Sequence, residues 1–454
     1  MKENFAGNIH FIGVGGISMS ALAEILLNRG CSVSGSDRNE SYLTKNLQKK
    51  GMRFYIGHNG ENISEDTTLV VYTVAVKEDN PELAEARRRG VTTIPRSKLL
   101  GEIMEQYKYS IAVSGTHGKT TTTSMLAYIL TGAELDPTIL VGGGLDLLGG
   151  TTLRLGKGEY ILAEACEYYR SFLDFKPFVA TVLTVEPDHL DYYKDKDDFQ
   201  GAFKDFAECI VPGGVLIACS DDEDMWKIIE HSKERVITYG IKSEADVTAR
   251  DITYKEGYPG YKLVIEGEEI CSVQLSVTGQ HNVINSLAAL ANAWALGLDI
   301  KQAAVSVGKF KGAMRRFEYK FDVGGAKIFD DYAHHPTEVK ATVQAANKLP
   351  HNKLVFVFQP HTYSRTKIFK EEFAVAFEGA DEVIVADIYA AREPFDPTIS
   401  SEMLARMIKE NGTGARAVSG NENIAKYLKE SLKPGDIAVV MGAGDIFKVY
   451  DLLK

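Results

Sequence analysis

The sequence predicts an α/β protein of three domains, of which the first and the third are Rossmann-like. At 454 residues the chain is long enough for about three domains of roughly 150 residues each. Short apolar runs alternate with helix-permissive segments, which is typical of parallel sheets covered by helices. A glycine-rich turn joins such a run to a helical pattern twice, at 13–16 and at 115–118. We place the domains at residues 1–107, 108–313 and 314–454.

The composition is that of an ordinary globular protein, with 44% hydrophobic and 25% charged residues. A formal net charge of −11 argues against nucleic acid and anionic membranes as partners, because both would repel the chain at long range. Residues 1–4 lead directly into a strand-like segment, and no apolar run approaches the roughly 18 residues of a membrane span. We therefore expect no signal peptide, no membrane contact and a cytoplasmic location. The five cysteines are odd in number and lack a CxxC pair, which predicts reduced thiols.

In the first domain, the apolar run 9–14 ends in a glycine-rich turn before a helical pattern. An acid follows about twenty residues later, at the end of the next predicted strand. This order is typical of dinucleotide folds, where the helix N-terminus faces a diphosphate and the acid reaches a ribose hydroxyl. A serine replaces the third glycine of the usual fingerprint, so NAD, another diphosphate ligand and an empty turn all stay open. The candidate residues are Gly13, Gly15, Gly16, Ser18 and Asp37.

The remainder of the first domain continues the alternating pattern. Strands are predicted at 69–72 and 92–95, with a helix over 81–89 between them. His58 falls in a loop, where an exposed histidine is the favoured interpretation over a ligand contact.

The central domain opens with an apolar run that ends at Val113, followed by SGTHGKT at 114–120 and a helix-permissive segment. Glycines let backbone N–H groups turn toward a polyphosphate, a lysine supplies a point charge, and a threonine hydroxyl can ligate Mg²⁺. The consensus loop would have glycine at 113, and this chain has it at 115. We predict a P-loop nucleotide-binding domain whose loop residues are Gly115, Thr116, His117, Gly118, Lys119 and Thr120.

Two further strands of this domain end in acidic or imidazole side chains. The strand 160–163 delivers Glu164, and the strand 178–185 leads to His189. Because ligands of open α/β sheets bind at the carboxyl ends of strands, Glu164 and Lys119 are expected to face one crevice. The Glu164 carboxylate would complete a Mg²⁺ site there. Mg²⁺ prefers oxygen ligands, so a histidine would be an unusual ligand for it. Two interpretations of His189 are therefore equally favoured: a ligand of a second metal or of Mn²⁺, and a capping or core histidine.

The segment 245–278 alternates in the manner of strands and predicts an antiparallel appendage. The helix that follows begins near 279 and carries Asn282 and Asn285 on one face. Both amides could bind a purine edge, and N-capping of the helix is an equal alternative.

The last third returns to alternation, with strands predicted at 327–329, 354–358, 383–386 and 437–441. Several of these strands end in Asp, His, Tyr and Arg side chains, above all at 330–335, 359–365 and 389–393. Adjacent histidines project differently, so substrate binding accounts for this mixture at least as well as a metal site does.

Taken together, the motifs of the chain closely resemble those of the muramyl ligase family. They are GTHGKT at 115–120, Glu164, DHLD at 188–191, HNxxN at 281–285, RRFE at 315–318 and DDYAHHPTE at 330–338. The segments HFIGVGGISMS, QPHTYSRT and YAARE narrow the resemblance to the branch that adds alanine.

The resemblance implies an ATP-dependent amide ligase of peptidoglycan synthesis that joins L-alanine to the lactyl carboxylate of UDP-N-acetylmuramate through an acyl phosphate. It implies a UDP-sugar-binding first domain, a central ATP-binding domain and a C-terminal domain that closes over the site. ATP, UDP-N-acetylmuramate and L-alanine would be its partners, with Mg²⁺ or Mn²⁺ as the metal, in a monomer or weak homodimer. A ligase that attaches a cell-wall tripeptide to the same sugar nucleotide is the alternative, and a nicotinamide-dependent dehydrogenase is a remote one.

The resemblance also implies roles for individual residues. Lys119, Thr120 and Thr121 would bind the phosphates of ATP. Thr120 and Glu164 would bind one Mg²⁺, and His189 would bind a second metal. Asn282, Asn285 and Arg316 would face the nucleotide. The substrate and amino-acid side falls to Asp331, Tyr332, His334, His361 and Arg365, with His334 orienting or deprotonating the amine. The catalytic group is then Lys119, Glu164, His189 and His334. Cys166 and Tyr169 replace acids of the family pattern, so only Glu164 and Glu167 carry over there.

Overall fold

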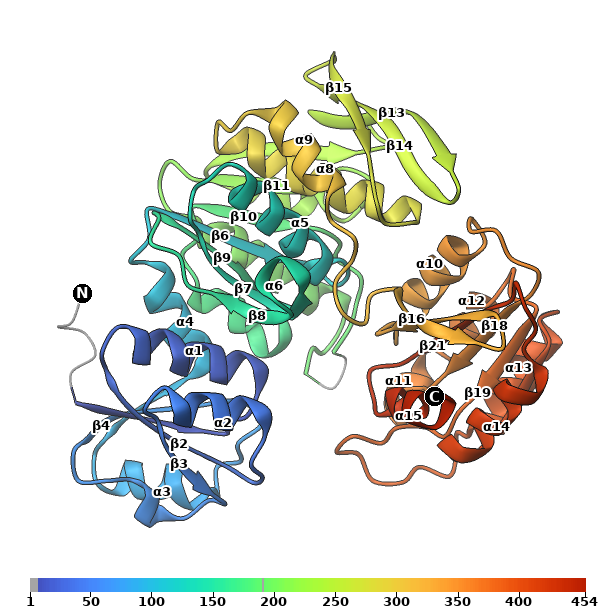
Figure 1. The fold of residues 1–454 in the computed structure, drawn as a ribbon. Coiled ribbons are helices and arrows are strands. Elements are labelled where there is room, and N and C mark those ends of the chain that lie inside the picture. The colour runs from blue at the N-terminus through green and yellow to red at the C-terminus, as the bar shows by residue number, and fades with distance from the viewer. Residues whose placement is uncertain (1–6, 190–191) are drawn as a thin grey trace. The chain divides into compact units, whose positions relative to one another are not determined.

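The computed structural model describes residues 7–189 and 192–454, and within them the predicted α/β class with parallel sheets is confirmed (Figure 1). The tetrapeptide 1–4, together with Leu190 and Asp191 of the DHLD motif, lies outside the described residues. The chain forms two compact units, one of Met1–Thr248 with Leu287–Ala303 and one of Ala249–Ser286 with Ala304–Lys454. Within the described ranges, no helix combines the length and apolar character that a bilayer crossing requires.

The first sheet has the strand order β3-β2-β1-β4-β5 and is parallel throughout. The chain leaves β1 toward one side and returns to its other side at β4, so the strand order reverses next to β1 at the glycine-rich turn. The elements are β1 Asn8–Ile12, α1 Ile17–Asn28, β2 Ser32–Asp37, α2 Tyr42–Lys49, β3 Arg53–Ile56, β4 Thr67–Tyr72, α3 Pro81–Arg88, β5 Thr92–Pro95 and α4 Arg96–Met104, with a 3-10 turn at Gly60–Asn62.

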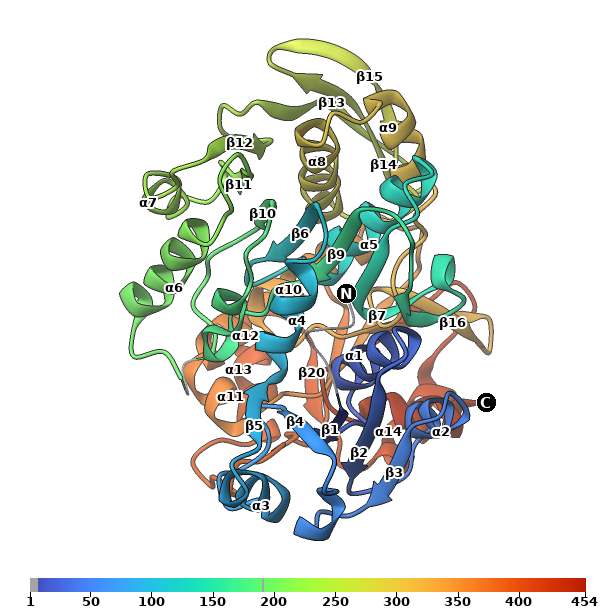
Figure 2. The ribbon, with the colours of Figure 1, turned by 90° about the vertical axis from the view of Figure 1, so that its left-hand side faces the viewer.

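The second sheet of the first unit has the order β12-β11-β10-β6-β9-β7-β8. The central strand β6 is parallel to both neighbours, and its residues Ile111, Ala112 and Val113 are fully buried. Helix α5 runs along this sheet (Figure 2). The elements are β6 Tyr109–Ser114, α5 Lys119–Gly132, β7 Thr138–Leu145, β8 Thr151–Arg154, β9 Tyr160–Glu164, β10 Val179–Val182, α6 Lys196–Glu208, β11 Val215–Cys219, α7 Trp226–Ile229 and β12 Arg235–Gly240, with 3-10 turns at Asp146–Leu148 and Tyr168–Asp174.

The predicted antiparallel appendage is present as a ribbon of strands. Strand β14 pairs antiparallel with β15, and the first two residues of β13 pair with β12 in parallel. The hydroxyl groups of Tyr261 and Ser286 lie 2.7 Å apart and join the ribbon to the start of α8. The elements are β13 Val247–Lys255, β14 Tyr258–Ile265, β15 Glu268–Gln274, α8 Gln280–Ala295 and α9 Ile300–Gly308.

The third sheet has the order β16-β17-β21-β18-β19-β20 and is covered on both faces. Phe356 and Phe358 of β18 pack into one apolar core, whereas Val355 and Val357 pack into the other. The four predicted strands are found, but β16 and β20 were not predicted, because β16 is a largely exposed edge strand and β20 has only three residues.

The helices and strands of the third domain follow in chain order. They are β16 Glu318–Val323, β17 Ala326–Asp331, α10 Pro336–Ala346, β18 Leu354–Phe358, α11 Tyr363–Ile368, α12 Lys370–Ala376, β19 Glu382–Val385, α13 Ser401–Glu410, β20 Ala415–Ala417, α14 Asn421–Ser431, β21 Ile437–Met441, a 3-10 turn at Ile446–Lys448 and α15 Val449–Leu453.

Candidate active site

The phosphate loop between β6 and α5 depends on two glycines. Gly118 is the N-cap of α5 and has φ 85°, a conformation that favours glycine. Gly115 has φ 129°, and a Cβ atom there would lie 2.9 Å from the backbone nitrogens of Leu183 and Thr184. The chain that leaves β10 therefore passes directly against the loop. This close approach explains why the loop has its glycine at 115.

Hydrogen bonds fasten the loop to the segment that follows β10. The backbone N–H of Thr116 donates to the carbonyl of Thr184 at 2.8 Å, and its hydroxyl donates to the carbonyl of Glu186 at 2.7 Å. The N–H of His117 donates to the hydroxyl of Thr184 at 3.1 Å. The predicted loop residues are thus held in one conformation at the carboxyl edge of the sheet.

Lys119 is engaged by a buried carboxylate. Its ammonium nitrogen lies 3.0 and 2.9 Å from the two carboxylate oxygens of Glu167, and it also donates to the carbonyl of Gly115 at 2.5 Å. Burial alone would lower the pKa of Lys119, but the neighbouring groups, above all the charge and hydrogen bond of Glu167, together raise this pKa. The lysine therefore carries its positive charge where α5 begins, as phosphate binding requires.

Glu164 is the last residue of β9 and joins two segments of the predicted site. One of its carboxylate oxygens accepts from the backbone N–H of Gly142 at 2.5 Å, and the other accepts from the hydroxyl of Thr120 at 3.2 Å. A Cβ at residue 142 would lie 2.8 Å from the Glu164 carboxylate, so the contact needs glycine there. The hydroxyl and carboxylate oxygens are the hard donors that Mg²⁺ prefers, and this pair fits that ion.

His189 lies on the other side of Glu167. Its Nε2 atom is 3.6 Å from a carboxylate oxygen of Glu167 and 3.9 Å from one of Asp188. Its ring stacks on Tyr168, with the ring centres 4.4 Å apart. The structure therefore places His189 beside the acid that holds Lys119, while its role as a metal ligand stays a prediction.

The glycine turn of the first domain is organised by the end of β2. The N–H groups of Gly13 and Val14 donate to the carbonyl of Ser36, and the N–H of Gly15 donates to the carboxylate of Asp37 at 2.8 Å. Asp37 thus fixes the turn, and its predicted contact with a ribose stays a prediction. Gly16 caps α1 without a side-chain hydrogen bond. Exposed Ser18 lies in the first turn of α1.

The interpretation of His58 as an exposed loop histidine was wrong. Its side chain is 21% exposed, and its Nδ1 atom lies 2.8 Å from a carboxylate oxygen of Glu82. The sequence did not reveal this contact because the two residues are far apart in the chain and on different elements.

In the second unit, Asn282 and Asn285 share a helix face as predicted. The amide nitrogen of Asn285 donates to the side-chain oxygen of Asn282 at 3.1 Å, and the amide nitrogen of Asn282 donates to the carbonyl of Thr278 at 2.7 Å. Helix α8 begins at Gln280, so neither asparagine is its N-cap. Burial, followed by the charge of Arg316, lowers the pKa of the intervening His281 to about 4.

The predicted substrate residues of the C-terminal domain gather at the carboxyl ends of β17 and β18. The Nδ1 atom of His334 lies 3.0 Å from the carbonyl of Tyr332, and its ring makes an edge contact with His361 at 5.9 Å between centres. Arg365 donates to the carbonyl of His361 at 3.0 Å. Tyr389 stacks on His361 and belongs to the cluster, although sequence reasoning named it only within the YAARE segment.

Asp331 and Arg316 complete this group. The carboxylate of Asp331 is buried and accepts from the N–H groups of Phe317 and Ala333. Burial raises the pKa of Asp331 to about 6. The guanidinium of Arg316 lies 3.8 Å from Glu338 and over the ring of Tyr332.

Three family models match the chain in order. They are "Mur ligase family, catalytic domain" at 8–108, "Mur ligase middle domain" at 113–293 and "Mur ligase, glutamate ligase domain" at 315–444. A relative from Acetivibrio thermocellus named UDP-N-acetylmuramate–L-alanine ligase is 48% identical over 454 residues, which is 100% of this chain and 96% of the relative. The chain belongs to the Mur ligase family. The predicted three-domain architecture is confirmed, and the exact domain boundaries stay predictions.

Further relatives agree with this assignment. A Clostridium novyi protein named UDP-N-acetylmuramate–L-alanine ligase is 48% identical over 100% of this Mur ligase and 98% of its own length. The crystal structure of a UDP-N-acetylmuramate-alanine ligase from Thermotoga maritima matches with TM-score 0.83 and 29% identity over 98% of each chain. A murein peptide ligase from Psychrobacter arcticus shares the fold, with TM-score 0.72 and 24% identity over 99% of this chain and 98% of its own.

Neither of the residues that replace the family's acids supplies a carboxylate to this Mur ligase. Burial, followed by the charge of Glu167, raises the pKa of the Cys166 thiol to about 11, so the thiol stays protonated. Tyr169 is half-exposed and contacts the rings of Tyr168 and Tyr192. The negative charge that faces Lys119 therefore comes from Glu167. The family resemblance assigns no role to Glu167, and its position soon after the strand of Glu164 is the one sequence signal for it.

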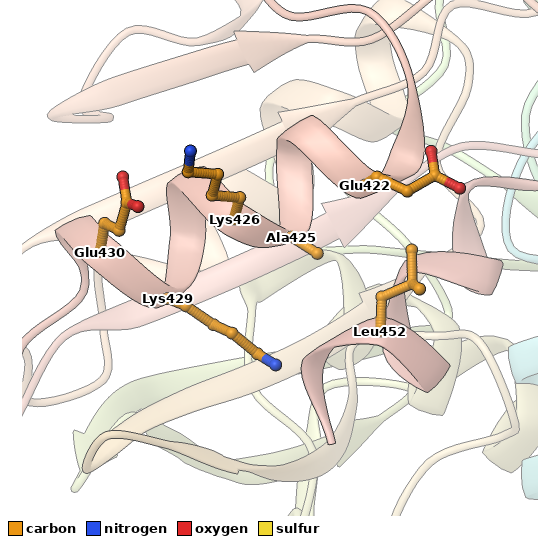
Figure 3. Close-up of a pocket in the computed structure, with 6 residues that line it drawn as sticks. All are labelled: Glu422, Ala425, Lys426, Lys429, Glu430 and Leu452. Carbon is orange, nitrogen blue, oxygen red and sulfur yellow. The ribbon is translucent and has the colours of Figure 1, made fainter.

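A surface hollow on the Mur ligase C-terminal domain contains none of the predicted site residues. Helix α14 and Leu452 of α15 line it (Figure 3). Its lining residues are Glu422, Ala425, Lys426, Lys429, Glu430 and Leu452. The helix presents two acids and two lysines there, and such a mixture of charges is typical of a solvated surface.

Proposed function

We propose that this Mur ligase uses ATP to join L-alanine to the lactyl carboxylate of UDP-N-acetylmuramate. The observation that carries the ATP-dependent part is a charged Lys119 at the start of α5, inside a loop built on Gly115 and Gly118. The full-length relatives named as UDP-N-acetylmuramate–L-alanine ligases, at 48% identity, carry the choice of substrates.

The chemistry accounts for the parts of the site. A carboxylate is a poor electrophile, so the lactyl carboxylate first attacks the γ-phosphorus of ATP and ADP leaves. The amine of L-alanine then attacks the acyl carbon of the resulting acyl phosphate, and inorganic phosphate leaves with formation of the amide. Lys119 and the backbone N–H groups at the start of α5 would stabilise the charge on the transferring phosphoryl group.

Mg²⁺ would be held by Thr120 and Glu164, whose oxygen atoms converge at 3.2 Å. When bound, the ion supplies further neutralisation of phosphate charge. His189 fits a Mg²⁺ site less well, because Mg²⁺ prefers oxygen ligands, whereas imidazole is a better ligand for transition-metal ions. Mn²⁺ is therefore the alternative for a second metal site there. The acids Glu167 and Asp188 next to His189 could provide oxygen ligands.

The remaining residues would bind the substrates. We assign the UDP-sugar to Gly13, Gly15, Gly16, Ser18 and Asp37, and the nucleotide to Thr121, Asn282, Asn285 and Arg316 in addition to the phosphate loop. Asp331, Tyr332, His361 and Arg365 would shape the amino-acid side, and His334 would orient the amine or take its proton. We place the reaction in the cytoplasm, where ATP and nucleotide sugars are available, and in a monomer or weak homodimer.

The test is phosphate release from ATP in the presence of Mg²⁺ and UDP-N-acetylmuramate. We expect release that depends on L-alanine, with weaker response to L-serine and glycine. Release that depends on the cell-wall tripeptide and not on L-alanine would establish the recycling ligase instead. Absence of release with either L-alanine or the tripeptide in a folded, ATP-binding preparation would reject both ligase assignments.

A further inference from the structure

The N-terminal domain contains a buried carboxylate that is linked to its glycine turn by hydrogen bonds. Glu82 lies in the first turn of α3, and its side chain has no solvent exposure. Its two oxygens are surrounded by donors on three other segments. The hydroxyl of Ser36 lies 2.6 Å away, the amide nitrogen of Asn62 2.7 Å, Nδ1 of His58 2.8 Å and Nε2 of His10 3.4 Å.

A single residue, Ser36, connects this carboxylate with the glycine turn. The side chain of Ser36 donates to Glu82, while its backbone carbonyl accepts from the N–H groups of Gly13 and Val14 at 2.9 and 3.0 Å. The next residue, Asp37, accepts from Gly15. Three consecutive amides of the turn are therefore oriented by the last two residues of β2.

Position 82 carries an acid at a place where an apolar side chain would be easier to bury. Removing a carboxylate from water is unfavourable unless hydrogen bonds and charges compensate. Burial alone would raise the pKa of Glu82, but the hydrogen bonds from His10, Ser36 and Asn62 hold it below its usual range. The N-terminal turn of α3 adds the favourable end of the helix dipole. The surroundings of Glu82 therefore favour its charged form.

We propose that Glu82 is a positioning residue for the diphosphate of the sugar nucleotide, acting through Ser36 on the amides of the glycine turn. The inference rests on the proposed function, because it takes the turn to be the UDP-sugar site. Glu82 itself does not touch the ligand. Its effect is to fix the end of β2, so that the turn is already shaped for two phosphate groups before they bind.

The experiment compares Glu82→Gln with the wild type. The substitution keeps the size of the side chain but converts one acceptor oxygen into a donor that faces donors. We expect the KM for UDP-N-acetylmuramate and the Kd for UDP to rise about tenfold, because a turn that is no longer fixed by the end of β2 must be ordered when the diphosphate binds. The KM for ATP and kcat at saturation should stay within about twofold, since the phosphate loop belongs to another sheet.

Two further variants make the result decisive. Glu85→Gln changes a partly exposed acid on the same helix, paired with Arg88, and should leave every constant unchanged. Ser36→Ala removes the hydroxyl that links Glu82 to the turn, and it should reproduce the rise in KM for the sugar nucleotide. If Glu82→Gln does not fold, as judged by thermal unfolding, Ser36→Ala decides the question.

The outcomes separate this inference from the proposed function. An unchanged KM for the sugar nucleotide in the folded Glu82→Gln variant, or in Ser36→Ala when the first variant is unfolded, would overturn it. A parallel loss of kcat and of affinity for both substrates would show a general structural role and would overturn it as well. A wild-type protein that neither binds UDP nor turns over UDP-N-acetylmuramate would instead reject the proposed function.

Discussion

The ammonium nitrogen of Lys119 lies 2.9 Å from a carboxylate oxygen of Glu167. The same carboxylate is 3.6 Å from Nε2 of His189, so that one buried acid connects the phosphate-loop lysine with the predicted metal-binding histidine. The acid lowers the electrostatic penalty of burying Lys119 and fixes where its charge lies. The position of the lysine charge in the predicted phosphate loop therefore depends on a residue outside the loop.

Replacing Lys119 with alanine removes the point charge that faces the transferring phosphoryl group. We expect turnover to fall by at least about 10²-fold, the scale of losing one preorganised charge. The measurement is phosphate release at saturating substrates. Lys157→Ala, which changes an exposed lysine, is the control and should keep its activity. Near-normal turnover of Lys119→Ala would contradict the phosphate-loop assignment.

Glu167→Gln leaves the ammonium group of Lys119 without its carboxylate partner. The side chain of Lys119 is 18% exposed and keeps its contacts to loop carbonyls. We therefore expect the free energy of unfolding to fall by about 3 kcal/mol, at the lower end for a broken buried pair. Urea unfolding measures this loss.

The double variant with Lys119→Ala provides the control for this pair. It should recover part of the lost stability, because the unpaired charge is gone. Equal stabilities of the wild type and of Glu167→Gln would show that the pair contributes nothing.

Gly115→Ala introduces a Cβ where the chain after β10 approaches to 2.9 Å. The new atom would meet backbone, which cannot rotate away, and the residue would keep an unfavourable positive φ. We expect ATP affinity to fall by at least about tenfold, measured by calorimetric titration. Gly201→Ala is the matched control, since it lies inside α6 with nothing within 4 Å of its added Cβ. Wild-type affinity in Gly115→Ala would contradict the geometry of the loop.

The pH dependence of stability should reveal Asp331. Its pKa is about 6 in the folded protein and near 3.8 ordinarily, so the native state retains a proton that the unfolded chain has released. Its contribution to stability is thus present at low pH and is lost as the pH rises from about 4 to about 6. Asp331→Asn should remove this falling component from the thermal unfolding midpoint across that range. Parallel pH profiles of variant and wild type would rule the shift out.

His361 should affect the pH dependence of stability in the opposite direction. Burial, with the nearby charges of His334 and Arg365, lowers its pKa from 6.5 to about 4. His361 therefore binds a proton in the unfolded chain at pH values where it stays unprotonated in the native state. Stability is lost as the pH falls from about 6.5 to about 4. In His361→Gln this loss should be smaller, as unfolding midpoints over the same range will show. A variant that is as acid-sensitive as the wild type would contradict the lowered pKa.

Much of this site was predictable because its residues follow strands. Parallel strands place their carboxyl ends at one edge, so the pairing of Thr120 with Glu164 could be expected from the sequence. The contact between Gly115 and the chain at Leu183 could not be predicted, because it depends on the paths that the chain takes after it leaves two neighbouring strands. Glu167 and Glu82 were also missed as partners, because long-range contacts of a single acid leave no periodic signal in the sequence.

The hydrogen bonds from Thr116 and His117 to Thr184 and Glu186 have a mechanical consequence. They make the phosphate loop and the strand exit that leads toward His189 a single rigid piece. We therefore expect a nucleotide that binds at the loop to influence the position of the segment that carries His189.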